Sequence, residues 1–166
     1  MSDLWLNFAV LIFVQFLVFL IHAYYEKKLA DVPRVLWQGA LTGIVVGMPL
    51  DLIFGKYLGL ATYLLGFSPF FLLLLGALGW GLFAANILLM QQARLLHFCF
   101  WAMFVAGVSE VINLFFPLFT YPFSYASIEY VSIAFGSLLV LAIVIALAFH
   151  ILFGRRFVFL DNVIKR

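Results

Sequence analysis

GALTGIVVGMPLDLIFGKYLGLATY, residues 39–63, is a hydrophobic segment with three glycines at four-residue spacing and one carboxylate, Asp51. The glycines are Gly39, Gly43 and Gly47. Residues four apart share one helix face, so a neighbouring helix can approach this face closely. Pro49 has no backbone N–H, and we expect the helix to bend just before the acid. Lipid cannot solvate a carboxylate, so Asp51 must face protein or a cavity, either bonded by a neighbour or as a functional group.

The composition excludes a soluble globular domain. Of the 166 residues, 67% are hydrophobic and 10% are charged, whereas a soluble domain is about half apolar. One cysteine, Cys99, allows no internal disulfide and no cysteine-cluster metal site. The chain has no nucleotide-binding loop and no serine-hydrolase or zinc-protease motif, and we expect no cofactor, no metal and no nucleic-acid partner.

The hydrophobic runs predict an all-α, polytopic membrane protein with five transmembrane helices in a single integral membrane domain, residues 1–166. Each run is long enough to cross the hydrocarbon core. The expected helices are residues 4–25, 35–54, 67–90, 96–116 and 131–153, followed by a cytoplasmic tail, residues 154–166. Gln15 is the lone polar residue in the middle of the first span, and we expect it to hydrogen-bond to another helix.

The basic residues predict the orientation in a cell membrane that the chain crosses several times. With five spans, Lys56 falls on one side and all other Lys and Arg fall on the opposite side. The larger group is Lys27, Lys28, Arg34, Arg94, Arg155, Arg156, Lys165 and Arg166. Cytoplasmic loops carry an excess of basic residues, so the N-terminus is expected outside and the C-terminus inside.

The second and third helices, and the fourth and fifth, form two hairpins that are similar in sequence. Asp51 is followed twelve residues later by Tyr63 in Leu-Ala-Thr-Tyr, and Glu110 is followed eleven residues later by Tyr121 in Leu-Phe-Thr-Tyr. At about 1.5 Å per residue, both acids lie roughly 24 Å along their helices. The sequence therefore predicts one helix plus two related hairpins, with two acids at matching depth.

Two carboxyl groups at one depth in an apolar site favour proton chemistry, because like charges repel and one group then keeps its proton. Such a proton can be delivered to an alkene, whose carbocation is stabilised by aromatic faces, or it can serve proton-coupled transport. The alternative is that each acid only caps a loop or bonds a tyrosine, and the same holds for Glu129 in the loop. The candidate catalytic residues are Asp51, Glu110 and Glu129. The candidate substrate-binding residues are Tyr63, Trp80, Asn113 and Tyr121.

The segments from Asp51 to Tyr63 and from Glu110 to Tyr121 resemble the acid-then-aromatic-x-Tyr pattern of the small membrane lycopene cyclases and related carotenoid-biosynthesis proteins. The Pro-x-Glu-Glu element of that family is absent, and its nearest match is Ile128-Glu129-Tyr130. The resemblance implies a polyene or other isoprenoid lipid substrate and an isomerase-like or lyase-like reaction at the three acids.

The stretch Gly43-x3-Gly47-x2-Leu50-Asp51-Leu52-Ile53-x-Gly55-x2-Leu58-Gly59-Leu60 is also similar to the glycine-rich segment of the rod-shape-determining protein MreD. That resemblance implies a non-enzymatic subunit of a cell-envelope complex. Docking of a partner subunit, or of a second copy, is then expected on the Gly39, Gly43 and Gly47 face. A small transporter subunit is a third alternative.

Overall fold

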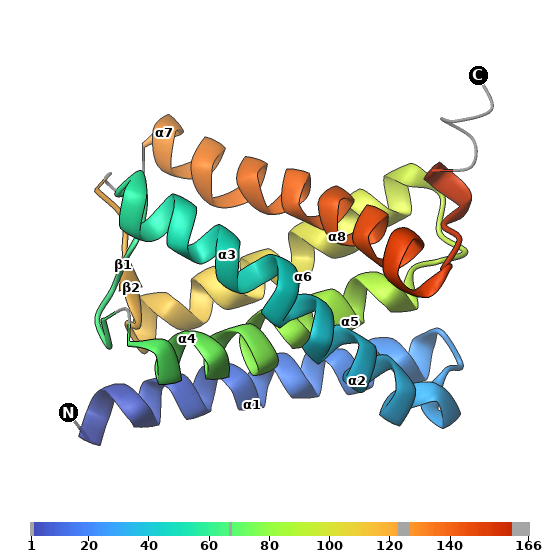
Figure 1. Ribbon diagram of the computed structural model, residues 1–166, viewed down its shortest axis with the longest axis horizontal. Coiled ribbons are helices and arrows are strands. Elements are labelled where there is room, and N and C mark those ends of the chain that lie inside the picture. The colour runs from blue at the N-terminus through green and yellow to red at the C-terminus, as the bar shows by residue number, and fades with distance from the viewer. Residues whose placement is uncertain (1, 67, 123–126, 161–166) are drawn as a thin grey trace.

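The computed structural model describes residues 2–66, 68–122 and 127–160, and within them helices form five rods that run along the long axis of the molecule (Figure 1). The first rod is α1 (Ser2–Tyr25), and the fourth is α6 (Leu95–Phe115). The second joins α2 (Val32–Thr42), η2 (Gly43–Gly47), α3 (Met48–Asp51) and η3 (Leu52–Tyr57), after a 3-10 turn, η1 (Leu29–Asp31). The third joins α4 (Pro69–Leu74), η4 (Leu75–Trp80) and α5 (Gly81–Leu89). The fifth joins α7 (Ile128–Val131), η5 (Ser132–Gly136) and α8 (Ser137–Phe153).

The all-α prediction is confirmed. In the described part of the chain, the only strands are the two-residue β1 (Thr62–Tyr63) and β2 (Phe119–Thr120), which pair antiparallel. Within the described ranges, four helical segments are long and apolar enough to cross a membrane: Asp3–Tyr25, Leu29–Tyr57, Pro69–Leu89 and Leu95–Phe115. Ser137–Phe153 is a shorter apolar helix. These lengths and compositions indicate a membrane protein.

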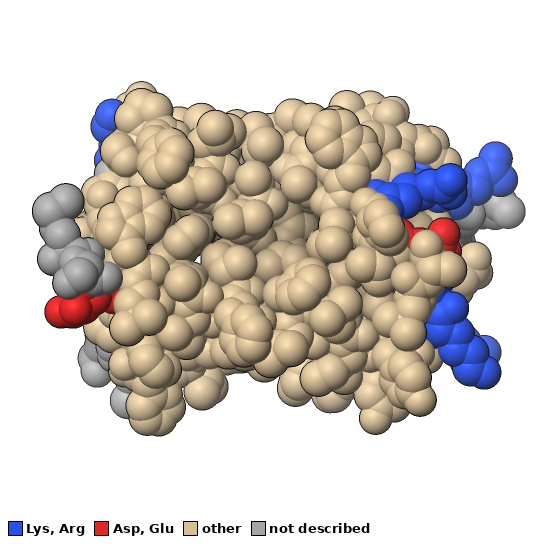
Figure 2. Space-filling model, turned by 90° about the horizontal axis from the view of Figure 1, so that it is seen from below, with Lys and Arg blue, Asp and Glu red and all other residues tan. Residues whose placement is uncertain are grey.

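Charged side chains gather at the two ends of the rods. Figure 2 shows Lys, Arg, Asp and Glu at both ends of the molecule and none of them on the long side between, which is hollowed. The connections at the end that holds Tyr25 carry Lys27, Lys28, Arg94 and Arg155. An uncharged band between charged ends is the surface expected where a bilayer surrounds a protein.

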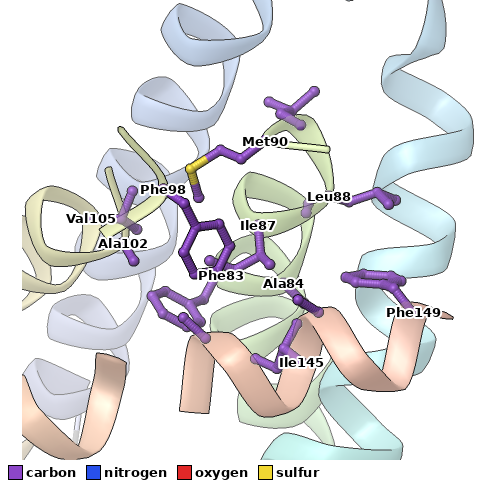
Figure 3. Close-up of a cluster of buried hydrophobic side chains, with 14 of the residues drawn as sticks. Phe83, Ala84, Ile87, Leu88, Met90, Phe98, Ala102, Val105, Ile145 and Phe149 are labelled. Atoms are coloured by element: carbon purple, nitrogen blue, oxygen red, sulfur yellow. The ribbon is translucent and has the colours of Figure 1, made fainter. Parts of the chain in front are cut away.

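The third rod is the centre of the bundle. Every residue of α5 is buried, and Figure 3 shows Phe83, Ile87 and Leu88 among side chains of α6 and α8, including Phe98 and Ile145. The core therefore lies around α5, in the half of the molecule that holds most of the basic residues.

The glycines of the second rod pack inside the chain, against this central rod. A Cβ added at Gly39 would lie 2.5 Å from the Gly81 carbonyl oxygen, and one added at Gly43 would lie 2.5 Å from the Gly81 nitrogen. At Gly47, an added Cβ would lie 2.5 Å from the Trp80 Cβ. The face that was expected to receive a partner subunit or a second copy is thus already covered by η4 and α5.

The described part of the tail, residues 154–160, folds back onto the bundle. Gly154 ends α8 in the left-handed conformation, with φ of 63°. Phe157 and Phe159 are then buried, and the Phe159 ring lies 4.3 Å from the Phe98 ring. The Val158 amide also donates to the Gln91 carbonyl oxygen at 2.9 Å. Residues 161–166 of the expected tail, with Lys165 and Arg166, lie outside the described residues.

Candidate functional site

A cavity of about 160 Å³ lies between the five rods, in the half of the bundle that holds β1 and β2. Each rod contributes to its wall, for example through Leu11, Asp51, Leu75, Glu110 and Leu138. Most of the lining is aliphatic or aromatic. The cavity thus brings two carboxyl groups from separate helices into one apolar chamber.

Asp51 is held in this wall by two neutral donors. The Tyr63 hydroxyl donates to Asp51 Oδ1 at 2.5 Å, and the Trp80 indole N–H donates to Asp51 Oδ2. Asp51 is only 5% exposed, so these donors take the place of water. Burial, and then the adjacent Asp51 carboxylate, raise the pKa of the Tyr63 phenol well above its ordinary value. The phenol therefore keeps its proton and remains a donor at neutral pH.

Glu110 is held in a matching way. The Tyr121 hydroxyl donates to Glu110 Oε1 at 2.7 Å, and the Tyr130 hydroxyl donates to Glu110 Oε2 at 2.8 Å. Tyr130 comes from α7 and is buried, as Glu110 is. Each acid is therefore bonded by the tyrosine of the Thr-Tyr pair that follows it and by an aromatic donor from the next rod.

The paired strands join the two loops that carry these tyrosines. Thr62 lies opposite Thr120, and Tyr63 lies opposite Phe119. Asn113 fixes the second loop, because its Oδ1 accepts from the Leu118 and Phe119 amides at 2.8 and 3.1 Å. Its Nδ2 also donates to the Phe119 carbonyl oxygen at 2.8 Å. These contacts make Asn113 a structural cap of the loop that covers the cavity.

The structure thus brings five of the seven candidate residues together: Asp51, Tyr63, Trp80, Glu110 and Tyr121 line the cavity. The other two do not line it. Asn113 is buried beneath the loop, and Glu129 is exposed in the first turn of α7.

Three polar residues that sequence reasoning did not assign to the site also belong to the cavity wall. They are Gln15, Ser109 and Ser137. Gln15 Nε2 donates to Ser109 Oγ at 2.8 Å, which confirms the hydrogen bond expected between the first span and another helix. The position of Gln15 in the middle of an apolar span was the only signal for it in the sequence.

Among the described residues, no group of three or more His, Cys, Asp or Glu side chains is arranged to hold a metal ion. His22 instead stacks on Trp101, with ring centroids 4.2 Å apart, and its Nδ1 lies 2.9 Å from Asn86 Oδ1. Because Asn86 Nδ2 donates to the Leu82 carbonyl oxygen, Asn86 Oδ1 accepts and His22 Nδ1 carries the proton. This cluster packs the bundle at the opposite end from the acids.

A comparison of the chain with protein-family models, with curated proteins and with solved structures finds no match in any of the three. The chemistry of the cavity therefore carries the functional assignment.

Proposed function

We propose that this protein crosses the cell membrane five times and binds the end of an isoprenoid or carotenoid-type hydrocarbon in the acid-lined cavity, where a carboxyl group transfers a proton to the substrate. The single observation that carries the proposal is that Asp51 and Glu110 line one apolar cavity. All five rods supply the same wall, and in the proposal the substrate meets both acids there. An excess of basic residues at the opposite end supports a cytoplasmic position for that end and an external N-terminus.

The hydrogen-bond partners distinguish the two acids. Trp80 can only donate, so Asp51 Oδ2 is an acceptor, and a proton on Asp51 would have to lie on Oδ1, beside the Tyr63 phenol. The two partners of Glu110 are phenols, which can donate or accept, so either oxygen of Glu110 can carry a proton while both contacts are kept. We therefore assign Glu110 as the proton donor in the proposal and Asp51 as the negative group that stabilises the cation.

The proposed reaction begins with transfer of the Glu110 carboxyl proton to an alkene carbon. The O–H bond breaks, a C–H bond forms, and the neighbouring carbon becomes a carbocation. Phe54, Phe83 and Phe119 line the cavity, and aromatic rings can stabilise such a cation. Loss of a proton from an adjacent carbon back to Glu110 then forms a new double bond and restores the acid. No external proton is consumed over the cycle.

The test is pigment chromatography of cells that make an acyclic polyene and express the wild type or an acid-to-amide variant. The wild type is expected to change the polyene profile relative to empty vector, and Asp51→Asn and Glu110→Gln are expected to abolish the change. Glu129→Gln is the matched control, because Glu129 is exposed outside the cavity. An unchanged profile in the wild type, or full activity in both cavity variants, would overturn the proposal.

A docking subunit remains the second candidate, but the glycine face gives it no support. Added Cβ atoms at Gly39 and Gly43 would collide with backbone of the chain's own third rod, and one at Gly47 with the Trp80 side chain. A partner would have to bind elsewhere on the bundle. A transporter subunit receives no specific support from the lining, which is mostly apolar.

A further inference from the structure

The cavity holds two acids and no basic side chain. Among the described residues that line it, Asp51 and Glu110 are the ionisable acids, and no Lys, Arg or His is present. All hydrogen bonds described above for the two acids come from phenol or indole donors, which are neutral. A carboxylate in an apolar site is stabilised far more by a positive charge than by neutral donors. The cavity therefore lacks the counter-charge that its acids would favour.

Gln15 adds an independent observation, because its carbonyl oxygen has no hydrogen-bond partner. Gln15 lines the cavity and is only 7% exposed, and its Oε1 accepts no hydrogen bond in the described structure. The amide orientation is fixed by Ser109, whose hydroxyl donates to the Val105 carbonyl oxygen at 3.1 Å and so must accept from Gln15 Nε2. A buried acceptor without a donor is unfavourable. The wall thus needs a ligand that donates N–H or O–H bonds.

We propose that the cavity binds small lipophilic amines as ammonium ions, with the ammonium group between the two carboxyl groups and a hydrocarbon ring against the aromatic wall. An ammonium supplies both the missing positive charge and the N–H donor for Gln15. Aromatic faces also attract cations. A cavity of about 160 Å³ is close to the roughly 150 Å³ that accepts benzene, so one six-membered ring fills it.

The neutral amine is the form that crosses the hydrocarbon region, and it takes its proton inside the cavity. The Glu110 O–H bond breaks, an N–H bond forms, and the product is an ammonium between two carboxylates. No other reactant is needed. This binding activity does not require that the protein convert a polyene, so it goes beyond the function proposed above.

The test compares cyclohexylamine with cyclohexanol, which has the same ring and no basic nitrogen, on the full chain in detergent micelles. Binding is followed by calorimetry. A charged pair with hydrogen bonds in a buried site is expected to favour the amine by at least about tenfold in Kd. Asp51→Asn and Glu110→Gln are each expected to reduce this preference, and the matched control Asp31→Asn, an exposed residue at the opposite end, is expected to keep it. Equal affinity for amine and alcohol in the wild type would overturn the proposal, as would an undiminished preference in both cavity variants.

A second measurement needs no variant. Cyclohexylamine is expected to protect Asp51 and Glu110 of the wild type from a small apolar carbodiimide, while cyclohexanol protects them about tenfold less well at the same concentration. Modification is counted as acylurea and cyclohexylamide together, because a primary amine also captures an activated carboxyl group. Unchanged labelling in the presence of the amine would contradict binding at the acids. The outcome also separates the two proposals, because amine binding without polyene conversion supports this inference and overturns the proposed reaction. Polyene conversion without a preference for the amine supports the proposed reaction and overturns this inference.

Discussion

Removal of the Tyr130 hydroxyl tests the proposed environment of Glu110. The hydroxyl donates to Glu110 Oε2 at 2.8 Å, and Tyr130 and Glu110 are only 6% and 5% exposed, so water cannot replace the lost bond. A buried hydrogen-bonding group that is left without its partner costs about 1–3 kcal/mol. We therefore expect Tyr130→Phe to lower the free energy of unfolding by about 2 kcal/mol, and to lower Tm by about 4–8 °C for a chain of this size.

The assay is unfolding by sodium dodecyl sulfate in mixed micelles, followed by near-ultraviolet circular dichroism. Tyr57→Phe is the matched control, because Tyr57 is 75% exposed. Its effect is expected to stay within about 0.5 kcal/mol, as for most surface substitutions. The same substitution at a buried and at an exposed tyrosine separates the hydrogen bond from the general effect of losing a hydroxyl.

A double-mutant cycle with Glu110→Gln then assigns the loss to this pair. Because the two side chains are in direct contact, their combined effect is expected to differ from the sum of the single effects by about 1 kcal/mol or more. Two results would show that Tyr130 does not stabilise the protein through Glu110. One is a loss of unfolding free energy in Tyr130→Phe as small as that in Tyr57→Phe. The other is additivity of Tyr130→Phe and Glu110→Gln within about 0.3 kcal/mol.

Three further predictions concern packing, ionisation and the loop. Gly43→Ala is expected to lower the free energy of unfolding by about 3 kcal/mol, because the added methyl group would meet backbone atoms that cannot move aside. Gly136→Ala is the control, since a methyl group there meets nothing within 4 Å. It should be neutral or mildly stabilising in the same unfolding assay. Since the pKa of Tyr63 is raised, its contribution to stability is complete below its ordinary value of 10.0 and is lost as pH rises through the raised value. Tyrosinate absorbance should show a late-titrating phenol that Tyr63→Phe removes, and an unchanged titration curve would contradict this. Asn113→Leu removes three loop hydrogen bonds and should lower the free energy of unfolding by about 3 kcal/mol. Proteolysis after Phe119 should also become faster. A cleavage rate equal to that of the wild type would show that the loop does not depend on Asn113.

The helices were the most predictable part of the fold. Long apolar runs interrupted by charged turns can only form helices in a membrane, because every backbone group must be bonded within its own segment. The sequence therefore placed the helices within a few residues of their observed ends, for example residues 4–25 against Ser2–Tyr25. It did not predict the π-helical turns η2 and η3 on either side of α3, which carries Pro49. The helix continues through this proline.

Within the site, the acid-then-tyrosine repeat identified Tyr63 and Tyr121 because the spacing returns each loop to the end of its own helix. Tyr130 was missed, since it lies in α7 and its contact with Glu110 of α6 joins two rods. Local spacing carries no information about such contacts. The adjacent Glu129 attracted attention through its charge, yet helical geometry turns it outward while Tyr130 turns inward.

The glycine repeat shows the same limit. Four-residue spacing correctly predicted that a helix approaches Gly39, Gly43 and Gly47 closely, but it cannot tell a neighbouring rod of the same chain from a separate subunit. The close approach to Gly81 shows that the third rod of the same chain covers this face.

Labelling with diisopropylcarbodiimide tests most directly that Asp51 and Glu110 share one ring-sized cavity. This small apolar reagent adds to protonated carboxyl groups, and peptide mapping with intact-mass analysis counts the adducts on each chain. Because the cavity holds about 160 Å³, the first adduct fills it. We expect chains that are labelled at Asp51 or at Glu110 but never at both. Glu110→Gln is expected to increase the label on Asp51. Chains that carry both adducts would show that the two acids occupy separate spaces.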